Sequence, residues 1–100
     1  MKLSVADRLT LLNVLPKEGD YTTLKIVRKL RDDLSFSEEE HKILQFQKDG
    51  EMVRWNDMED TEIDIGEKAT DVIQQAFKEL DKQGKLHMEY LDLYERFIKE

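Results

Sequence analysis

The stretch with the clearest potential for chemistry is residues 56–67, NDMEDTEIDIGE, which holds six carboxylates and no basic residue. Closely spaced carboxylates are the ligands that calcium prefers, and the stretch can be aligned with a twelve-residue calcium loop. Two positions break the alignment, because Met58 stands where an oxygen ligand is needed and Thr61 replaces the glycine of the turn. The better interpretation is an acidic loop and a short strand, followed by a helix that Asp64 and Glu67 cap.

Two other residue pairs have spacings typical of reactive or metal-binding groups. Glu38 and His41 are spaced as half of a carboxylate-bridged di-metal site, but the only other histidine, His87, has Gly84 where the second glutamate is needed. Ser37 and His41 are four residues apart, yet a serine that caps a helix has its oxygen committed to backbone amides. The chain has no cysteine and no glycine-rich phosphate loop. The sequence therefore predicts no catalytic residue, no metal site and no cofactor, and we expect the protein not to be an enzyme.

Composition favours one soluble domain. A chain of 100 residues with 39% apolar residues can bury a single core, so we expect one small α+β domain over residues 1–100. No apolar stretch approaches the ~20 residues of a membrane span, and charged residues from position 7 onward argue against a signal peptide. We therefore expect a cytoplasmic protein that does not contact membranes.

Charge is distributed unevenly along the chain. The net charge is −7, with +2 over residues 1–34 and −9 over residues 35–100. A negative field of this size repels nucleic-acid phosphates and favours basic partners, although it also serves solubility.

The elements that must position these residues begin with two helices. Ser4 is placed to cap the first helix, which must end before Pro16 because proline disfavours helical geometry in the residue before it. Thr22 is placed to cap the second, with Tyr21 and Ile26 spaced as a hydrophobic staple.

The middle of the chain predicts a short helix and a hairpin. Residues 37–40 form a capping-box pattern whose carboxylates suit a helix N-terminus. Alternating runs flank Asp49-Gly50, which predicts a β-hairpin with a type I′ turn. The alternating run 62–65 fits a third strand. Trp55 and Met52 lie near the hairpin edge, where they are candidates for interface residues because aromatic residues and methionine are enriched at interfaces, but their expected place is the core.

The C-terminal third predicts a pair of helices. Apolar residues from Ala69 to Leu80 follow helical spacing, and Gly84 stands where a C-terminal glycine belongs. A second apolar face over residues 90–98 predicts a last helix, and the short connection makes the two helices antiparallel neighbours. The expected fold class is α+β: two N-terminal helices and a short third, a β-hairpin with a possible third strand, then an antiparallel C-terminal helix pair.

Three helices followed by a hairpin is also the order of elements in a winged-helix DNA-binding domain. Such domains contact phosphates through basic residues on the third helix and the wing. Here the third helix begins with three glutamates and the wing tip is Lys48-Asp49-Gly50-Glu51. A nucleic-acid-binding regulator that uses the basic second helix remains the alternative function, with an acidic mimic of DNA as a variant of the acidic hypothesis.

Segments across nearly the whole chain resemble a family of small acidic proteins of bacteriophages and prophages that have no assigned activity. The resemblance is carried by residues 7–19, 23–30, 34–40, 65–73 and 93–98. It implies a cytoplasmic protein of a mobile element, and it supplies neither an activity nor functional residues.

The leading hypothesis is a protein–protein interaction module that binds a partner, possibly a basic one, through an acidic surface. The residues expected to bind the partner are Asp57, Glu59, Asp60 and Glu62, with Glu38 and Glu39 as a second acidic patch. Lys25, Arg28 and Lys29 are expected to contact either a partner or a second copy of the chain. A homodimer is compatible with this, because a domain of this size gains stability from association.

Overall fold

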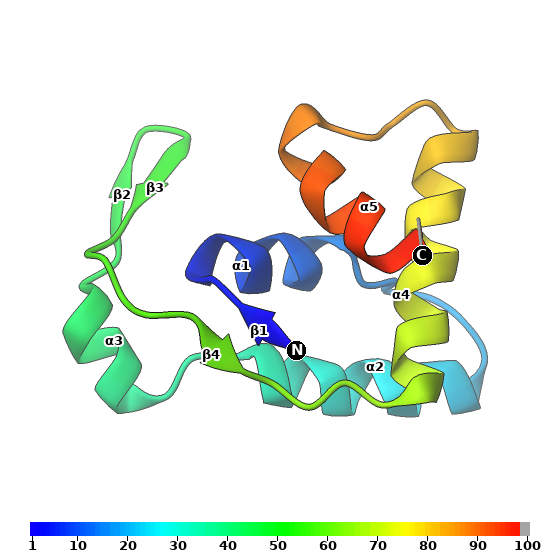
Figure 1. Ribbon diagram of the computed structural model, residues 1–100, viewed down its shortest axis with the longest axis horizontal. Coiled ribbons are helices and arrows are strands. Elements are labelled where there is room, and N and C mark those ends of the chain that lie inside the picture. The colour runs from blue at the N-terminus through cyan, green and yellow to red at the C-terminus, as the bar shows by residue number, and fades with distance from the viewer. Residues whose placement is uncertain (99–100) are drawn as a thin grey trace.

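The structure, a computed structural model, describes residues 1–98 and has the α+β architecture that the sequence predicts (Figure 1). The elements are β1 (Lys2–Leu3), α1 (Val5–Val14), α2 (Tyr21–Leu34), α3 (Glu38–Leu44), β2 (Gln47–Asp49), β3 (Met52–Arg54), β4 (Thr61–Glu62), α4 (Glu67–Lys82), the 3-10 helix η1 (Met88–Tyr90) and α5 (Leu91–Ile98). Within residues 1–98, no helix combines the length and the apolar composition needed to cross a bilayer.

Four helices, α1, α2, α4 and α5, form the body of the molecule. Figure 1 shows α2 along its lower edge, α4 rising beside the N-terminal part of α2, and α5 returning against α4, as the sequence predicts for the last two helices. The core between them contains Leu11, Leu30, Ile73, Phe77 and Phe97. Burying aromatic and branched side chains at this density is the main term that stabilises the body.

The first helix begins and ends as its sequence predicts, and the second begins earlier than predicted. The Ser4 hydroxyl accepts the Asp7 N–H while the Asp7 carboxylate accepts the Ser4 N–H, which is a full capping box. In α2 the cap is Asp20 and not Thr22, because the Asp20 carboxylate accepts the backbone N–H of Thr23 at 2.8 Å. Tyr21 is then the first helical residue and is 74% exposed, so the predicted hydrophobic staple does not form.

The sequence predicts the C-terminal end of α4 but not its N-terminal cap. Asp64 and Glu67 do not form the predicted cap: the N-cap is Gly66, which has no side chain to accept a hydrogen bond. At the other end the helix closes as predicted, with Gly84 in the left-handed region at φ 67°. The Gly84 N–H donates to the carbonyl of residue 81 and the next N–H donates to that of residue 80, which is a Schellman motif.

The third strand exists, but it belongs to a different sheet from the hairpin. Strand β4 pairs antiparallel with β1, matching Lys2 with Glu62, while β2 and β3 pair only with each other. The Ile63 N–H donates to the carbonyl of Met1 at 2.9 Å, and the Ile63 side chain enters the core. The pairing partner is the N-terminus because β4 passes beside it on the way to α4, whereas the hairpin projects elsewhere (Figure 1).

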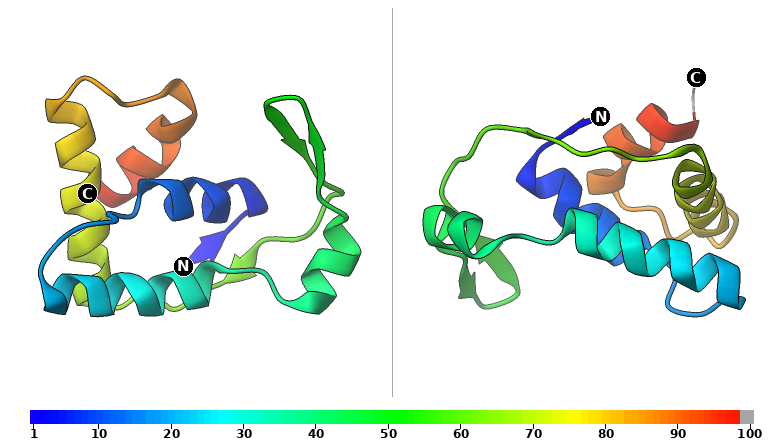
Figure 2. Two further views of the ribbon diagram at one scale, coloured as in Figure 1. Left: turned by 180° about the vertical axis from the view of Figure 1, so that it is seen from behind. Right: turned by 90° about the horizontal axis from the view of Figure 1, so that it is seen from below.

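Residues 36–60, which we call the arm, contain α3, the β2–β3 hairpin and the loop that leads to β4. In Figure 1 and in the view from behind in Figure 2, the arm stands at one end of the molecule, beyond the ends of α1 and α2. No residue of α3 or of the hairpin is part of the main core within residues 1–98. The arm therefore depends on contacts of its own to keep its position.

Candidate functional site

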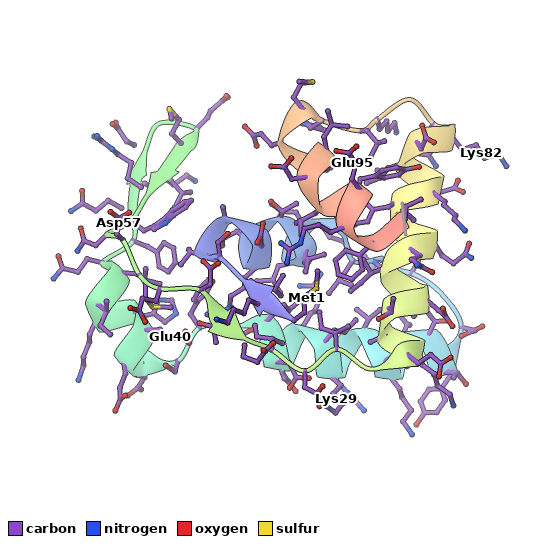
Figure 3. The ribbon with its side chains drawn as sticks, viewed as in Figure 1. Met1, Lys29, Glu40, Asp57, Lys82 and Glu95 are labelled. Atoms are coloured by element: carbon purple, nitrogen blue, oxygen red, sulfur yellow. The ribbon has the colours of Figure 1, made fainter. Side chains whose placement is uncertain are left out.

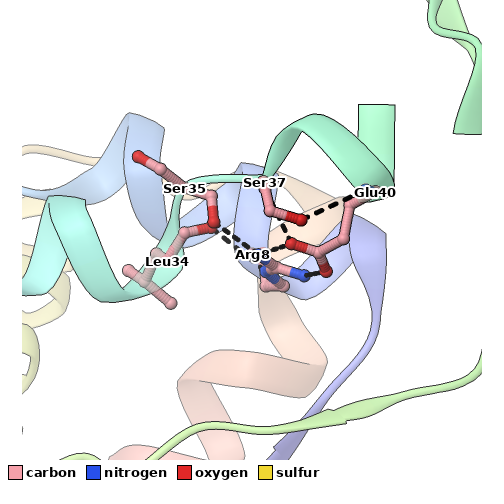
Figure 4. A network of polar contacts seen from close by, with 5 residues as sticks. All are labelled: Arg8, Leu34, Ser35, Ser37 and Glu40. Carbon is pink, nitrogen blue, oxygen red and sulfur yellow. Dashed lines mark hydrogen bonds and ion pairs between the residues drawn. The ribbon is translucent and has the colours of Figure 1, made fainter. Parts of the chain in front are cut away.

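A buried arginine fastens the arm to the body. Arg8, on α1, is 2% exposed and is the only buried charged side chain among residues 1–98. Its Nε donates to the Leu34 carbonyl at 3.1 Å and its Nη2 to the Ser35 carbonyl at 2.7 Å, both at the end of α2 (Figure 4). The guanidinium carbon also lies 4.0 Å from the centre of the Phe36 ring, within the range of a cation–π contact.

The fourth contact of Arg8 is an ion pair with Glu40 of α3. Arg8 Nη1 lies 2.7 Å from Glu40 Oε2, and Nη2 donates to Oε1 at 3.3 Å, so the pair is bidentate. The same carboxylate accepts the Ser37 N–H at 2.9 Å and completes the predicted capping box of α3. The hydrogen bonds from Arg8 lower the pKa of Glu40 from its ordinary 4.5 to about 2. We call this set of contacts the Arg8 clasp.

The sequence contains a signal for the Arg8 clasp that our reading of the motifs missed. Arg8 lies three residues after Val5 and three before Leu11, both buried, so it occupies a position of the apolar stripe of α1. A charged residue at such a position needs a buried partner, because an unpaired charge in a core is costly. Glu40 was interpreted only as part of a cap, and its second role depends on the tertiary fold.

Ring contacts hold the hairpin on α3. The Phe46 ring lies 5.2 Å from Phe36, 5.6 Å from His41 and 6.1 Å from Trp55, measured between ring centres. Asn56 continues the attachment, since its backbone N–H donates to the Leu44 carbonyl at 2.8 Å. His41 is therefore part of a small aromatic cluster and contacts Phe36 and Phe46.

The acidic residues predicted to bind a partner lie mostly on the arm. The arm contains eight Asp or Glu residues and three Lys or Arg, a net charge of −5. Asp57, Glu59 and Asp60 are exposed on the loop after β3, and Glu38 and Glu39 are exposed in the first turn of α3. Within residues 1–98 none of these five carboxylates makes a hydrogen bond or ion pair, so all five are free to meet another molecule.

Glu62 differs from the other predicted carboxylates. It lies on β4 and forms an ion pair with the amine of Met1, whose hydrogen bond lowers the pKa of the carboxyl below its usual range. This contact closes the end of the β1–β4 pair. Glu62 therefore has a structural contact in addition to its exposure.

The arm also exposes apolar side chains, including one that the sequence predicts to lie in the core. Met52, predicted to be in the core, is 71% exposed, and Val53 and Ile43 are 46% and 55% exposed. Met52 and Val53 are neighbours on β3 and so point to opposite faces of the hairpin. The short two-stranded sheet has no second layer to cover either face, which is why these residues remain in solvent.

The predicted basic residues lie on another part of the molecule. Lys25, Arg28 and Lys29 are exposed along α2, and Figure 3 shows Lys29 on the lower edge and Asp57 on the arm. Lys29 pairs with Asp33 one turn later at 3.1 Å. Lys25 Nζ lies 5.5 Å from the Tyr21 ring centre. The structure thus places the predicted acidic residues of the arm and the predicted basic residues of α2 on two surfaces, while Glu62 of β4 lines the same hollow as Lys29.

A hollow of about 490 Å³ lies between α2 and the beginning of α4. Its lining includes three lysines, Lys25, Lys29 and Lys68, and three carboxylates, Asp33, Asp64 and Glu67. Because these charges balance, the hollow does not select a ligand of either sign. Across the described part of the chain, His, Asp and Glu residues form no group of three or more that could hold a metal ion.

The winged-helix order of elements does not produce a winged-helix surface. A recognition helix packs on the two helices before it, whereas α3 contributes no residue to the main core in the described part of the chain and is held through the Arg8 clasp. Comparisons with protein-family models, with curated proteins and with solved structures each found no match.

Proposed function

We propose that the protein is a non-enzymatic interaction module that binds a basic protein partner through the arm. The observation that carries this proposal is the exposure of Ile43, Met52 and Val53 within a segment of net charge −5. The predicted cytoplasmic location and the resemblance to phage proteins suit such a role, in which a small protein of a mobile element captures a protein of its host cell.

The arrangement has the parts that a protein interface needs. Interfaces combine an apolar centre, often containing methionine or aromatic residues, with a polar rim that stays accessible to water. On the arm, the apolar side chains provide contact area, and the carboxylates of Asp57, Glu59 and Asp60 provide a field that attracts cations. Such a field raises the association rate of a basic partner and rejects acidic ones.

Rigidity supports the same conclusion. The Arg8 clasp and the aromatic cluster fix the arm, so a partner does not have to order it on binding. A pre-organised surface loses less conformational entropy when it binds than a flexible loop does.

The test is capture of partners from a native host lysate by three forms of the protein. The first is the unaltered chain, and the second carries Asp57→Lys, Glu59→Lys and Asp60→Lys. The control variant has the same net charge but carries lysines at three exposed acidic positions outside the arm: Glu18, Asp71 and Glu89.

We expect the unaltered chain and the control variant to capture the same protein, and the arm variant to lose it. Equal capture by the arm variant would refute the proposal. Micromolar binding of duplex DNA that weakens steeply with salt would favour the nucleic-acid function instead.

A further inference from the structure

The exposed side of α2 carries a line of residues with opposite charges, which could pair with the same line on a second copy of the chain. Tyr21, Lys25, Arg28 and Asp32 follow one another at intervals of four, three and four residues, so they form one stripe along the helix. The buried residues of the same helix are Val27, Leu30 and Leu34. We call the first set of four residues the α2 stripe. The buried residues lie about half a turn of the helix away from the α2 stripe, which therefore faces away from the core.

Two charges of the α2 stripe, Arg28 and Asp32, have no partner within residues 1–98, whereas Lys25 lies over the Tyr21 ring. Within residues 1–98, neither Arg28 nor Asp32 makes a hydrogen bond or ion pair, although Lys29 and Asp33 on the adjacent line of the helix do pair. Tyr21 is 74% exposed at the start of the stripe. Tyrosine and arginine, both present on this stripe, are residue types enriched at protein interfaces.

We propose that the α2 stripe binds the α2 stripe of a second copy, antiparallel and about a two-fold axis. Arg28 and Asp32 have opposite charges and are placed evenly about the level of Leu30. A two-fold axis at that level sets Arg28 of one protomer against Asp32 of its partner, and the symmetry repeats the pair. The four-residue spacing of Arg28 and Asp32 is therefore enough to form two complementary ion pairs in the dimer.

The same two-fold axis places one end of the lower edge of each protomer near the opposite end of the partner's lower edge. Figure 1 shows the start of α2 and the start of α3 at opposite ends of this edge, and the view from below in Figure 2 shows both helices on that side. An antiparallel pair directs the start of α2, with Tyr21 and Lys25, toward the partner's end of the edge, where Glu38 and Glu39 begin α3. The charge of Lys25 is complementary to those of the two glutamates.

The size of the contact predicts a weak dimer. A stable interface buries about 800 Å² on each partner, roughly a tenth of the 7505 Å² surface of this chain. Helix α2 has 14 residues, about four turns, so its stripe alone falls short of that area and a micromolar equilibrium between monomer and dimer is expected. The two-fold contact is closed, so the chain does not polymerise.

The α2 stripe is separate from Met52, Val53 and the acidic loop of the arm. A dimer built on the stripe leaves both copies of these residues accessible. If the proposed function of the arm is correct, the dimer presents two binding surfaces, and a partner with two basic sites gains affinity from both.

The experiment is sedimentation velocity over protein concentrations from micromolar to several hundred micromolar. The variants Arg28→Asp and Asp32→Arg each turn the two ion pairs into like-charge contacts, so each should weaken the dimer at least about tenfold. An equimolar mixture of the two variants should dimerise again, because every contact in the mixed dimer is complementary. The double variant carrying both changes should dimerise as the unaltered chain does.

The controls are Lys78→Asp and Asp71→Arg, which make the same charge changes at exposed positions of α4 and should leave the dimer unchanged. A monomer at every concentration would overturn the proposal. So would a dimer that both single variants leave intact, or a mixture that fails to restore association. The arm variant described above should still dimerise, so the two proposals can fail independently.

Discussion

Removing the charge of Glu40 tests whether the Arg8 clasp holds the arm in place. The variant Glu40→Gln keeps the shape of the side chain and most of its hydrogen-bonding capacity, but it leaves the guanidinium of Arg8 without a counter-charge. Because Arg8 is buried, the loss is not compensated by water as it would be at the surface. We therefore expect the variant to be less stable at neutral pH.

The magnitude follows from the pKa of Glu40. A decrease from 4.5 to about 2 corresponds to roughly 3 kcal/mol of preference for the charged carboxylate in the folded chain. The side chain retains 21% of its exposure, so screening by solvent reduces this figure, and about 2 kcal/mol is the expected loss in the free energy of unfolding. Glu39→Gln, at an exposed neighbouring carboxylate, should change the free energy of unfolding by less than about 0.5 kcal/mol.

The same pKa fixes the pH dependence. The pKa of Glu40 is lower in the folded chain than in the unfolded chain. Glu40 therefore makes its full contribution to the free energy of unfolding above about pH 5, and this contribution is lost as the pH falls toward 2. In Glu40→Gln this part of the acid destabilisation should be missing. The variant and the unaltered chain should therefore approach each other in stability as the pH is lowered.

The assay is urea unfolding between pH 7 and pH 3, followed by two probes. Trp55 is the only tryptophan of the chain and lies in the aromatic cluster of the arm, so its fluorescence reports on the arm. Far-ultraviolet circular dichroism reports mainly on the helices of the body. In the variant we expect the fluorescence transition to move to lower urea than the dichroism transition. An unchanged stability at neutral pH, with the same acid dependence as the unaltered chain, would refute this account.

Three further outcomes are expected from the local geometry. Gly84→Ala should cost about 1 kcal/mol in thermal unfolding because its φ is +67°, whereas Gly66→Ala, at φ −71° with open space around it, should be nearly neutral. Asp20→Ala should lower the melting temperature through loss of the α2 cap, and Thr22→Ala should not; the reverse order would contradict the assigned cap. Met52→Ser should leave the urea midpoint unchanged but weaken partner capture, and a lower midpoint would mean that Met52 supports the fold.

Elements that depend on neighbours in the chain were predictable. The apolar spacing of α4 and the glycine that ends it are read within a few turns of one helix. The hairpin was also predicted, but its turn was not. Asp49 pairs with Met52, so the turn residues are Gly50 and Glu51, and of these Gly50 alone has a positive φ, at 65°, which fits a type II′ turn and not the predicted type I′ turn at Asp49-Gly50. The cap of α2 was misplaced even at this range. Aspartate and threonine are both residue types that cap helices, and backbone geometry decided that Asp20 and not Thr22 is the cap.

The candidate site was predictable only in composition. The sequence shows that the middle of the chain is acidic, and it identifies Asp57, Glu59 and Asp60 as carboxylates outside regular elements. It does not show that Glu40 is committed to Arg8 or Glu62 to the N-terminal amine, because these pairs join residues 32 and 61 positions apart. Nor does periodicity show that Met52 is exposed, since an alternating strand looks the same whether or not a layer covers it.

By itself, then, the sequence determined the kinds of element, their order and the sign of the charge, because these follow from interactions over a few residues. The tertiary structure decided which distant segments meet: β1 with β4, and α1 with α3 through the Arg8 clasp. Those long-range contacts leave the arm outside the main core and the five carboxylates of the arm that are predicted to bind a partner in solvent. The physical reason is that a strand edge or a buried charge requires a partner but does not specify which distant residue supplies it.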